Sequence, residues 1–216
     1  MKLYDYWRST AAYRVRIALN LKGIAAEHEY VHLVKDGGQN NLPAFKAINP
    51  QGKIPALELD DGTALGQSIA IMEYLEETQP GPAILPADPV ARAQVRAFAM
   101  TIACELHAVN NLAVMKHLAA TFDLKESSGL DWMTHWMSLG FEALEESVAR
   151  RDNVGPYLFG PNPGMADACL VPQFYNARRW GVDLEAYPLL RACDEAACAH
   201  AAFAAAAPEA QADAEE

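Results

Sequence analysis

The sequence has few cysteines, little positive charge and no long apolar run. Its four cysteines lie at positions 104, 169, 193 and 198, without a C-x-x-C pair and without histidines at ligand spacing. We therefore expect neither a disulfide framework nor a metal site. Seventeen Lys and Arg against 28 Asp and Glu leave a net charge of −11, which argues against a nucleic-acid partner.

Membrane and secretion signals are also missing from the pattern. The longest apolar runs, such as residues 201–207, are far shorter than the roughly 20 residues that a membrane span needs. The first residues do not form a charged and then apolar leader. We expect a soluble, cytoplasmic protein that binds neither nucleic acid nor membrane.

A proline-rich stretch divides the chain into two parts of different charge. Residues 80–89 contain four prolines, which exclude a regular helix or a central strand. This stretch also holds the apolar pair Ile84 and Leu85. The pattern predicts a first domain over residues 1–80, a linker over 81–89 and a second domain over 90–216.

The first part alternates strand and helix patterns. We predict strands over residues 2–7, 29–33, 54–59 and 63–65, and helices over 10–22, about 42–47 and 67–78. Gly23 ends the first helix, and Asp60-Asp61-Gly62 is typical of a hairpin turn. The order β-α-β-α-β-β-α indicates a thioredoxin-like α/β domain, whose first two strands are parallel.

The second part carries helical periodicity throughout. Apolar residues at helical spacing predict two long helices, one with Val95, Phe98, Ile102, Leu106, Val109 and Ala113, the other with Leu130, Met133, Met137, Phe141, Leu144 and Val148. A third helix begins near Met165 and contains Pro172, where we expect a kink. After Pro188 one more helix leads into an Ala-rich, acidic tail, which we expect to fray after Pro208. The second part is therefore predicted to be an all-α bundle.

Two helix starts in the first part could bind anions. At the turn formed by residues 8–12, hydroxyls stand where a thioredoxin-like redox protein would hold cysteines, and residues 1–103 contain no cysteine. A Ser or Thr oxygen can cap the helix while its hydrogen points at a bound anion. The helix start at Gln67-Ser68 suits a carboxylate in the same way. Taken alone, Ser9 and Ser68 are more simply explained as helix caps.

A third element is the segment Lys53-Ile54-Pro55, at the beginning of a strand. A proline there leaves the backbone of the preceding residue available for pairing with an extended ligand. Whether the peptide bond between Ile54 and Pro55 is cis cannot be read from the sequence.

Together these elements resemble the signature of zeta-class glutathione transferases. Residues 6–19 read Tyr-Trp-Arg-Ser-Thr-Ala-Ala-Tyr-Arg-Val-Arg-Ile-Ala-Leu, and the family signature has Ser-Ser-Cys followed two residues later by Arg-Val-Arg-Ile-Ala-Leu. Further matches are Asn49-Pro50, Ile54-Pro55, Gly66-Gln67-Ser68, Ala166-Asp167 and Leu170-Val171-Pro172-Gln173. The resemblance spans residues 2 to about 205. The family includes maleylacetoacetate and maleylpyruvate isomerases.

The resemblance implies glutathione as the cofactor and a homodimer as the assembly. The residues that match the family's cofactor site are Ser9, Thr10 and Ala11 at the thiolate, Lys53, Ile54 and Pro55 at the cysteinyl part, Gln67 and Ser68 at the γ-glutamyl part, Gln39 near the glycyl end, and His107 and Asn111 in the second domain. Ser9 and Thr10 would stabilise the thiolate. For His107 the alternative is a core histidine whose polar atoms are satisfied within the protein.

The implied reaction is a cis–trans isomerisation of a small dicarboxylate. Ala11 replaces the cysteine of the family triplet, so chemistry that needs a protein thiol is doubtful, whereas isomerisation needs only the sulfur of the cofactor. Arg8 and Arg179 are candidates for binding substrate carboxylates, although Arg178-Arg179 could be a solvated helix face. Arg14 and Arg16 are expected to pair with acidic residues.

The choice of substrate rests on position 113 and on the segment 35–39, whose length resembles the maleylacetoacetate type. The maleylpyruvate branch of the family has an arginine on the first long helix at the position of Ala113, so its absence favours maleylacetoacetate. Maleylpyruvate isomerisation, a broad transferase that conjugates electrophiles, and a non-catalytic interaction module remain alternatives.

Overall fold

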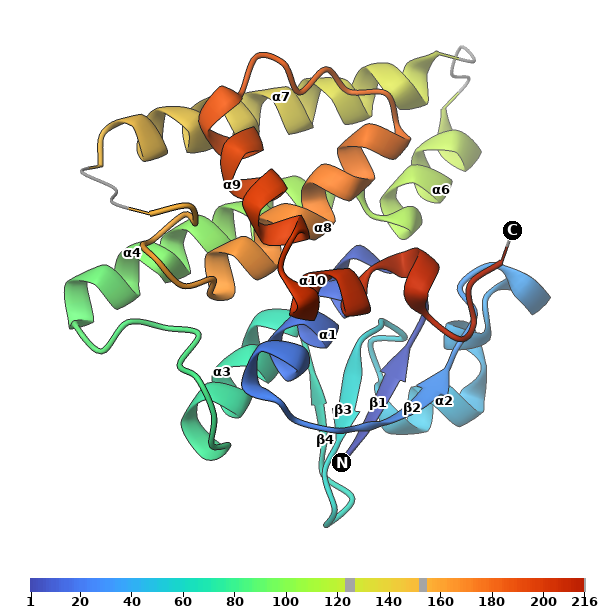
Figure 1. The fold of residues 1–216 in the computed structure, drawn as a ribbon. Helices are drawn as coiled ribbons and strands as arrows, with labels where there is room; N and C mark the ends of the chain where they lie inside the picture. The colour runs from blue at the N-terminus through green and yellow to red at the C-terminus, as the bar shows by residue number, and fades with distance from the viewer. Residues whose placement is uncertain (123–126, 152–154, 216) are drawn as a thin grey trace. The chain divides into compact units, whose positions relative to one another are not determined.

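A computed structural model describes residues 1–122, 127–151 and 155–215 (Figure 1). The chain forms two compact units, one made of residues 1–85 and 198–216 and the other of residues 86–197. The predicted division placed residues 198–216 with the helical part, whereas they pack with the first unit.

The first unit contains a four-stranded mixed sheet in the order β2-β1-β3-β4. Strand β1 (Lys2–Asp5) is parallel to β2 (Glu27–Tyr30) and antiparallel to β3 (Ala56–Glu58), which forms a hairpin with β4 (Ala64–Gly66). The parallel pair and the hairpin confirm the prediction. Strand β1 ends before the predicted Trp7 because the chain turns there, with the Ser9 N–H bonded to the Tyr6 carbonyl at 2.9 Å.

The helices of the first unit cover this sheet (Figure 1). Helix α1 (Thr10–Lys22) ends as predicted at Gly23, whose φ of 68° is the left-handed conformation that glycine adopts readily. Short 3₁₀ turns η1 (Lys35–Gly37) and η2 (Gln39–Asn41) precede α2 (Pro43–Ile48), and α3 (Ser68–Thr78) follows the hairpin. Buried α1 and α3 side chains, among them Val15, Ile17, Ile71 and Met72, form the core of this unit.

The apolar pair of the linker is anchored in the first unit. Ile84 and Leu85 are buried, and their N–H groups donate to the Glu76 carboxylate at 3.0 and 3.4 Å. The same carboxylate pairs with Lys22 at 3.1 Å. The linker therefore begins as a fixed part of this unit.

The second unit is helical, as predicted, but its first long helix is interrupted. Helix α4 (Pro89–Met100) continues through the π-helical turn η3 (Thr101–Leu106) into α5 (His107–Asn110), and α6 (Leu112–Thr121) starts anew. Asn111 breaks the run because its backbone is extended, with φ −73° and ψ 159°, and its side chain caps α6. The prediction of one long helix with a continuous apolar face is therefore wrong beyond Leu106, and Ala113 is exposed on α6.

The other helices of this unit follow the predicted pattern more closely. Helix α7 (Ser128–Ala149) buries all of its predicted apolar face except Leu130, which is 43% exposed. Helix α8 (Met165–Arg179) runs through Pro172, and α9 (Pro188–Cys198) follows. At the start of α8 the Asp167 carboxylate accepts from the Gly164 and Leu158 N–H groups, each at 2.9 Å. Burial raises the pKa of Asp167 to about 6.

The C-terminal tail is ordered against the first unit, so the prediction that it frays after Pro208 is wrong. Helix α10 (Ala201–Ala206) lies beside α1, and the turn η4 (Pro208–Ala210) follows it (Figure 1). The Gln211 Nε2 then donates to the carbonyls of Ala205 and Ala207 at 3.0 and 2.8 Å. These bonds hold the chain where composition alone predicts disorder.

By length and composition alone, the run Pro89–Thr121 could cross a membrane. One such run is weak evidence, because a core helix of a soluble protein passes the same test. Here the run is broken at Asn111 and buries Val95, Phe98 and Ile102 in the helical unit. This is the pattern of a packed bundle helix.

Candidate active site

The turn before α1 holds Ser9 in the position of a helix cap. Ser9 is only 9% exposed, has φ −72° and ψ 113°, and its Oγ accepts from the Ala12 N–H at 3.2 Å. Thr10 and Ala11 follow as the half-buried first residues of the helix. Because a hydroxyl also has one donor, Ser9 can cap α1 and still donate to an anion at the helix N-terminus.

Arg8 places a positive charge next to this turn. Its side chain is exposed, and its guanidinium carbon lies 4.9 Å from the centroid of the Trp7 ring. An exposed cation that is held over an aromatic face can still bind a carboxylate.

The start of α3 is an uncapped helix N-terminus. Gln67 has φ 67° and ψ 115°, a strained conformation for a residue other than glycine that costs on the order of 1–3 kcal/mol. No side chain caps α3 among the described residues, and the Gln67 Nε2 donates to the Gln51 Oε1 at 2.8 Å instead. Strain of this kind is often found at binding sites.

Ser68 completes this helix start. It is 5% exposed, and its Oγ accepts from the Nη1 of Arg14, itself 1% exposed, at 3.2 Å. The Ser68 oxygen accepts from Arg14, and the hydroxyl keeps its hydrogen for donation to a ligand. Arg14, predicted to pair with an acidic residue, thus supports a predicted site residue through a contact for which the sequence pattern carries no signal.

Ile54 leads into β3 with a free stretch of backbone. Its side chain is buried, and the bond to Pro55 is cis. Across the part of the chain that the structure describes, the Ile54 N–H and C=O form no backbone hydrogen bond outside the strand ladders. The neighbouring Lys53 is exposed, and its carbonyl accepts from the Asn49 Nδ2 at 2.7 Å. The Ile54 peptide groups are therefore available to an extended ligand.

Gln39 braces the loop that carries it. Its Oε1 accepts from the His32 N–H at 2.9 Å, and its Nε2 donates to Asp36 Oδ2 at 3.2 Å. A ligand contact by the Gln39 amide nitrogen would add to or replace the exposed bond to Asp36.

The predicted site residues of the helical unit lie on or beside helix ends. His107 is half-buried and opens α5 directly after the π-helical turn, a feature that is frequent at functional sites. The Asn111 Oδ1 caps α6 by accepting from Ala113 and Val114 at 3.0 and 3.1 Å. Arg179 is exposed at the end of α8, with its guanidinium carbon 5.8 Å from the Trp180 ring centroid. Their roles toward a ligand remain predictions.

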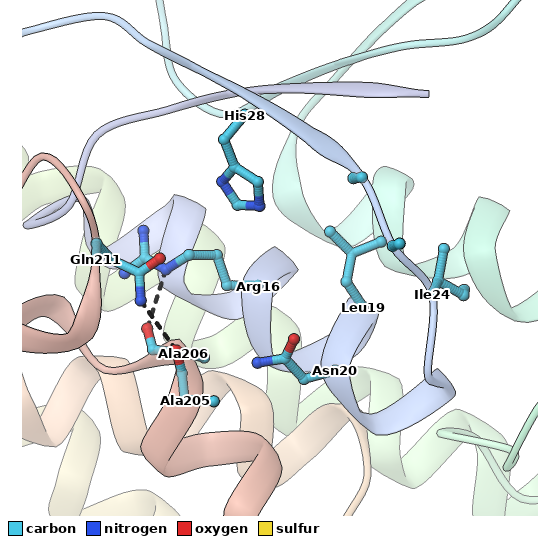
Figure 2. A pocket seen from close by; sticks show the side chains of 10 residues that line it. Arg16, Leu19, Asn20, Ile24, His28, Ala205, Ala206 and Gln211 are labelled. Carbon is cyan, nitrogen blue, oxygen red and sulfur yellow. Dashed lines mark hydrogen bonds between the residues drawn. The ribbon is translucent and has the colours of Figure 1, made fainter.

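A cavity of about 270 Å³ lies elsewhere in the first unit, between α1, the start of β2 and the end of α10 (Figure 2). It is lined by Arg16, Asn20, His28 and Gln211, among others, and by none of the predicted site residues. Its polar groups are already engaged, since Arg16 Nε donates to the Ala206 carbonyl at 2.9 Å and Asn20 Nδ2 to the Ala202 carbonyl at 2.9 Å. The cavity and the predicted site are therefore distinct.

Comparison with known proteins identifies the family of the chain. Residues 3–83 match the family model described as glutathione S-transferase, N-terminal domain. The chain is 45% identical to the maleylacetoacetate isomerase of Pseudomonas aeruginosa over 99% of its own length and 98% of the relative's. The chain therefore belongs to the glutathione transferase family.

Two solved structures define the class within this family. The chain is 46% identical, with a TM-score of 0.95 and full coverage of both chains, to a maleylpyruvate isomerase described as a bacterial zeta-class glutathione S-transferase. It is 39% identical, with the same TM-score and full coverage, to a maleylacetoacetate isomerase from Methylobacterium extorquens solved with malonate and glutathione bound. The zeta-class resemblance and the fold prediction are thereby confirmed.

Proposed function

We propose that this protein uses glutathione as a cofactor to convert maleylacetoacetate into fumarylacetoacetate. The carrying observation is the start of α3, where an uncapped helix N-terminus, a strained Gln67 and the buried Ser68 hydroxyl meet. These groups are the donors that a γ-glutamyl carboxylate requires. The glutathione-bound relative supports the same cofactor.

The remaining cofactor contacts are assigned along the tripeptide, from its cysteinyl part to its glycyl end. Ile54 would pair its N–H and C=O with the cysteinyl part, with Lys53 and Pro55 on either side of it. Gln39 would reach the glycyl end. In the helical unit, His107 and Asn111 are assigned to the cofactor by the resemblance alone.

Ser9 and Thr10 would hold the cofactor's sulfur as a thiolate. When bound, glutathione supplies a nucleophile whose reversible addition gives the cis double bond single-bond character, so that it can rotate. A free thiol has a pKa of about 8.5, so the Ser9 hydroxyl and the N–H groups at the start of α1 must favour the charged form. Ala11 contributes no thiol, which suits a reaction that leaves the cofactor unchanged.

The substrate's carboxylates need fixed cations. We assign this role to Arg8, beside the thiolate turn, and to Arg179, at the end of α8, because a guanidinium binds a carboxylate through two parallel hydrogen bonds. An Arg179→Ala protein is expected to show a raised KM for the substrate and an unchanged KM for glutathione. Normal isomerisation by that variant would remove Arg179 from the site.

Maleylpyruvate is the second candidate substrate, since the solved maleylpyruvate isomerase is as similar to this chain as the maleylacetoacetate isomerase of P. aeruginosa. We place the chain in the maleylacetoacetate branch because position 113 is alanine rather than arginine. We also propose that the protein is cytoplasmic and forms a homodimer. Sedimentation of the purified protein would test the homodimer.

Parallel rate measurements on the two substrates test the branch. We expect faster glutathione-dependent turnover of maleylacetoacetate, measured by coupling to fumarylacetoacetate hydrolysis, and a shift toward maleylpyruvate in an Ala113→Arg variant. Turnover of maleylpyruvate alone by the natural sequence would contradict the assignment.

A further inference from the structure

The C-terminal segment Pro208–Glu215 contacts two parts of the first unit that carry predicted glutathione-binding residues. Its Asp213 Oδ2 accepts from the Trp7 N–H at 2.9 Å, across 206 positions of sequence. Its Glu215 carboxylate pairs with the Lys35 ammonium and lies 3.5 Å from the His32 Nε2. Trp7 immediately precedes the turn of Arg8 and Ser9, and His32 is bonded to Gln39.

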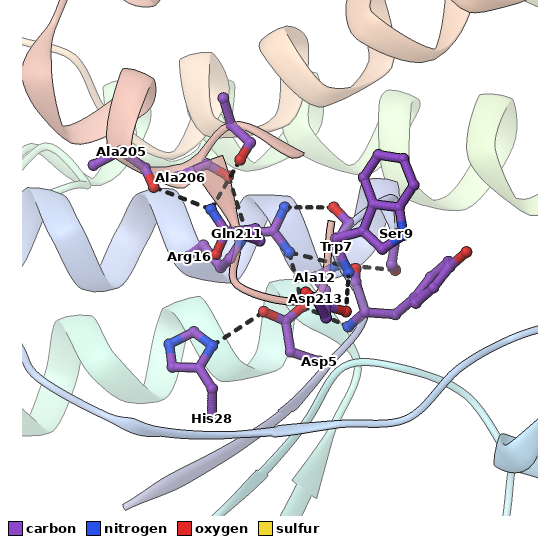
Figure 3. A network of polar contacts seen from close by, with 12 residues as sticks. Asp5, Trp7, Ser9, Ala12, Arg16, His28, Ala205, Ala206, Gln211 and Asp213 are labelled. Carbon is purple, nitrogen blue, oxygen red and sulfur yellow. Dashed lines mark hydrogen bonds and ion pairs between the residues drawn. The ribbon is translucent and has the colours of Figure 1, made fainter. Parts of the chain in front are cut away.

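The backbone N–H and C=O of Trp7 are both bonded to charged side chains (Figure 3). The Asp213 carboxylate accepts from the Trp7 N–H, and the Arg16 Nη2 donates to the Trp7 carbonyl at 2.9 Å. The Arg16 Nη1 is in turn fixed by the buried carboxylate of Asp5 at 2.8 Å, and the Arg16 Nε by the carbonyl of Ala206 at 2.9 Å. The orientation of this peptide thus depends on the tail and on the end of α10.

The turn itself cannot replace the Asp213 contact. Within the turn, the Ser9 N–H donates to the Tyr6 carbonyl and the Ser9 Oγ accepts from the Ala12 N–H. Neither bond involves the Trp7 N–H, which has no local acceptor among the described residues. Trp7 is only 7% exposed. Without Asp213, this buried donor would be unsatisfied, which favours a different turn conformation.

Glu215 acts on the second segment. The His32 N–H donates to the Gln39 Oε1, and the Gln39 N–H donates to the His32 carbonyl at 2.8 Å. Through Lys35 and His32, the tail therefore restrains the loop that presents Gln39.

We propose that the tail is a working part of the glutathione site and that Asp213 is a positioning residue, which fixes the Trp7–Ser9 turn in its thiolate-binding conformation. This inference rests on the proposed function. None of the predicted ligand contacts involves the acidic tail, and this inference gives the tail a role. Asp213 acts through the backbone of Trp7 rather than on the cofactor itself.

Two substitutions at Asp213 separate positioning from general stability. Asp213→Ala removes the acceptor, and we expect the Kd for glutathione, measured by calorimetry, to rise about tenfold. The KM for glutathione should rise in parallel, and the KM for the dicarboxylate should rise as well, because Arg8 lies in the same turn. Asp213→Asn keeps a carbonyl oxygen for the Trp7 N–H, so we expect it to bind glutathione within about threefold of the natural protein.

A control removes a carboxylate of the same unit elsewhere. Glu77→Ala deletes an exposed charge near the end of α3 and should leave the glutathione Kd unchanged. Thermal unfolding of each variant reports stability separately from binding.

The outcomes are distinguishable. If the natural protein binds glutathione and Asp213→Ala binds it equally well, the positioning role is wrong while the proposed function stands. Equal losses in Asp213→Asn and Asp213→Ala, with equally lowered melting temperatures, would also overturn it, because a structural role alone explains that result. A natural protein that does not bind glutathione would remove the proposed function and this inference together.

Discussion

Replacing Ser9 by alanine separates its two roles, as a cap of α1 and as a donor to the thiolate. The cap is visible in the bond from the Ala12 N–H to the Ser9 Oγ at 3.2 Å. Its loss costs about 1 kcal/mol, which for a chain of this size lowers the melting temperature by about 2–4 °C. Loss of a hydrogen bond to a charged group costs about 1.5–3 kcal/mol.

This second cost falls on the ionised cofactor. At about 1.36 kcal/mol per pKa unit, the pKa of the bound thiol should rise by about one to two units. With glutathione saturating, kcat/KM for the dicarboxylate should then fall about 10- to 100-fold at pH values below the pKa of the bound thiol, and the acid limb of its pH profile should move to higher pH by the same one to two units.

The assay is the pH dependence of glutathione-dependent isomerisation by the natural protein and by two variants. Ser9→Thr keeps the hydroxyl and should preserve the profile, while Ser9→Ala should shift it. If Ser9→Ala lowers only the melting temperature and leaves the pH profile unchanged, Ser9 is a helix cap and the thiolate assignment is refuted.

Three further predictions concern other parts of the structure. Ser68→Ala should raise the KM for glutathione about tenfold with kcat nearly unchanged, since it removes a ground-state contact; an unchanged KM would exclude the γ-glutamyl role. Gly140→Ala would place a methyl group 2.2 Å from the Leu106 Cδ1. This overpacking should destabilise the protein by about 1–3 kcal/mol and lower its melting temperature. The control Gly129→Ala, whose nearest contact is at 3.6 Å, should not lower the melting temperature. Since the pKa of Asp167 is about 6 when folded and about 3.9 when unfolded, the folded state binds more protons between these values, so the unfolding free energy should fall as pH rises from about 4 to 6. Asp167→Asn should lack this component in urea titrations at several pH values, and an identical pH dependence in both proteins would contradict the assignment.

The sequence was most informative where local rules act alone. Helix α1 was predicted to the residue because the polar turn before it and Gly23 after it mark both ends. The hairpin of β3 and β4 followed from Asp-Asp-Gly. The zeta-class signature then predicted ligand-binding roles for Ser9, Ile54 and Ser68, which no local rule distinguishes from structural residues, and these roles stay predictions.

The errors arise where distant contacts override the local pattern. The break at Asn111 was missed because the apolar spacing continues past it, while its side chain caps a new helix. The tail was predicted to fray because its composition is Ala-rich and acidic, and its order depends on bonds such as that from Trp7 to Asp213. The contact between Arg14 and Ser68 also joins positions 54 residues apart. Pattern reasoning on one sequence does not reach such pairs.

The central claim is that glutathione acts as a catalyst in cis–trans isomerisation, and thiol counting during turnover tests it most directly. Maleylacetoacetate would be supplied in large excess over glutathione, and free thiol would be titrated as fumarylacetoacetate forms. We predict that many molecules of product form for each glutathione, with the thiol concentration unchanged and no reaction when glutathione is omitted. Loss of one thiol for each substrate molecule consumed would show conjugation instead, and a rate independent of glutathione would contradict the account.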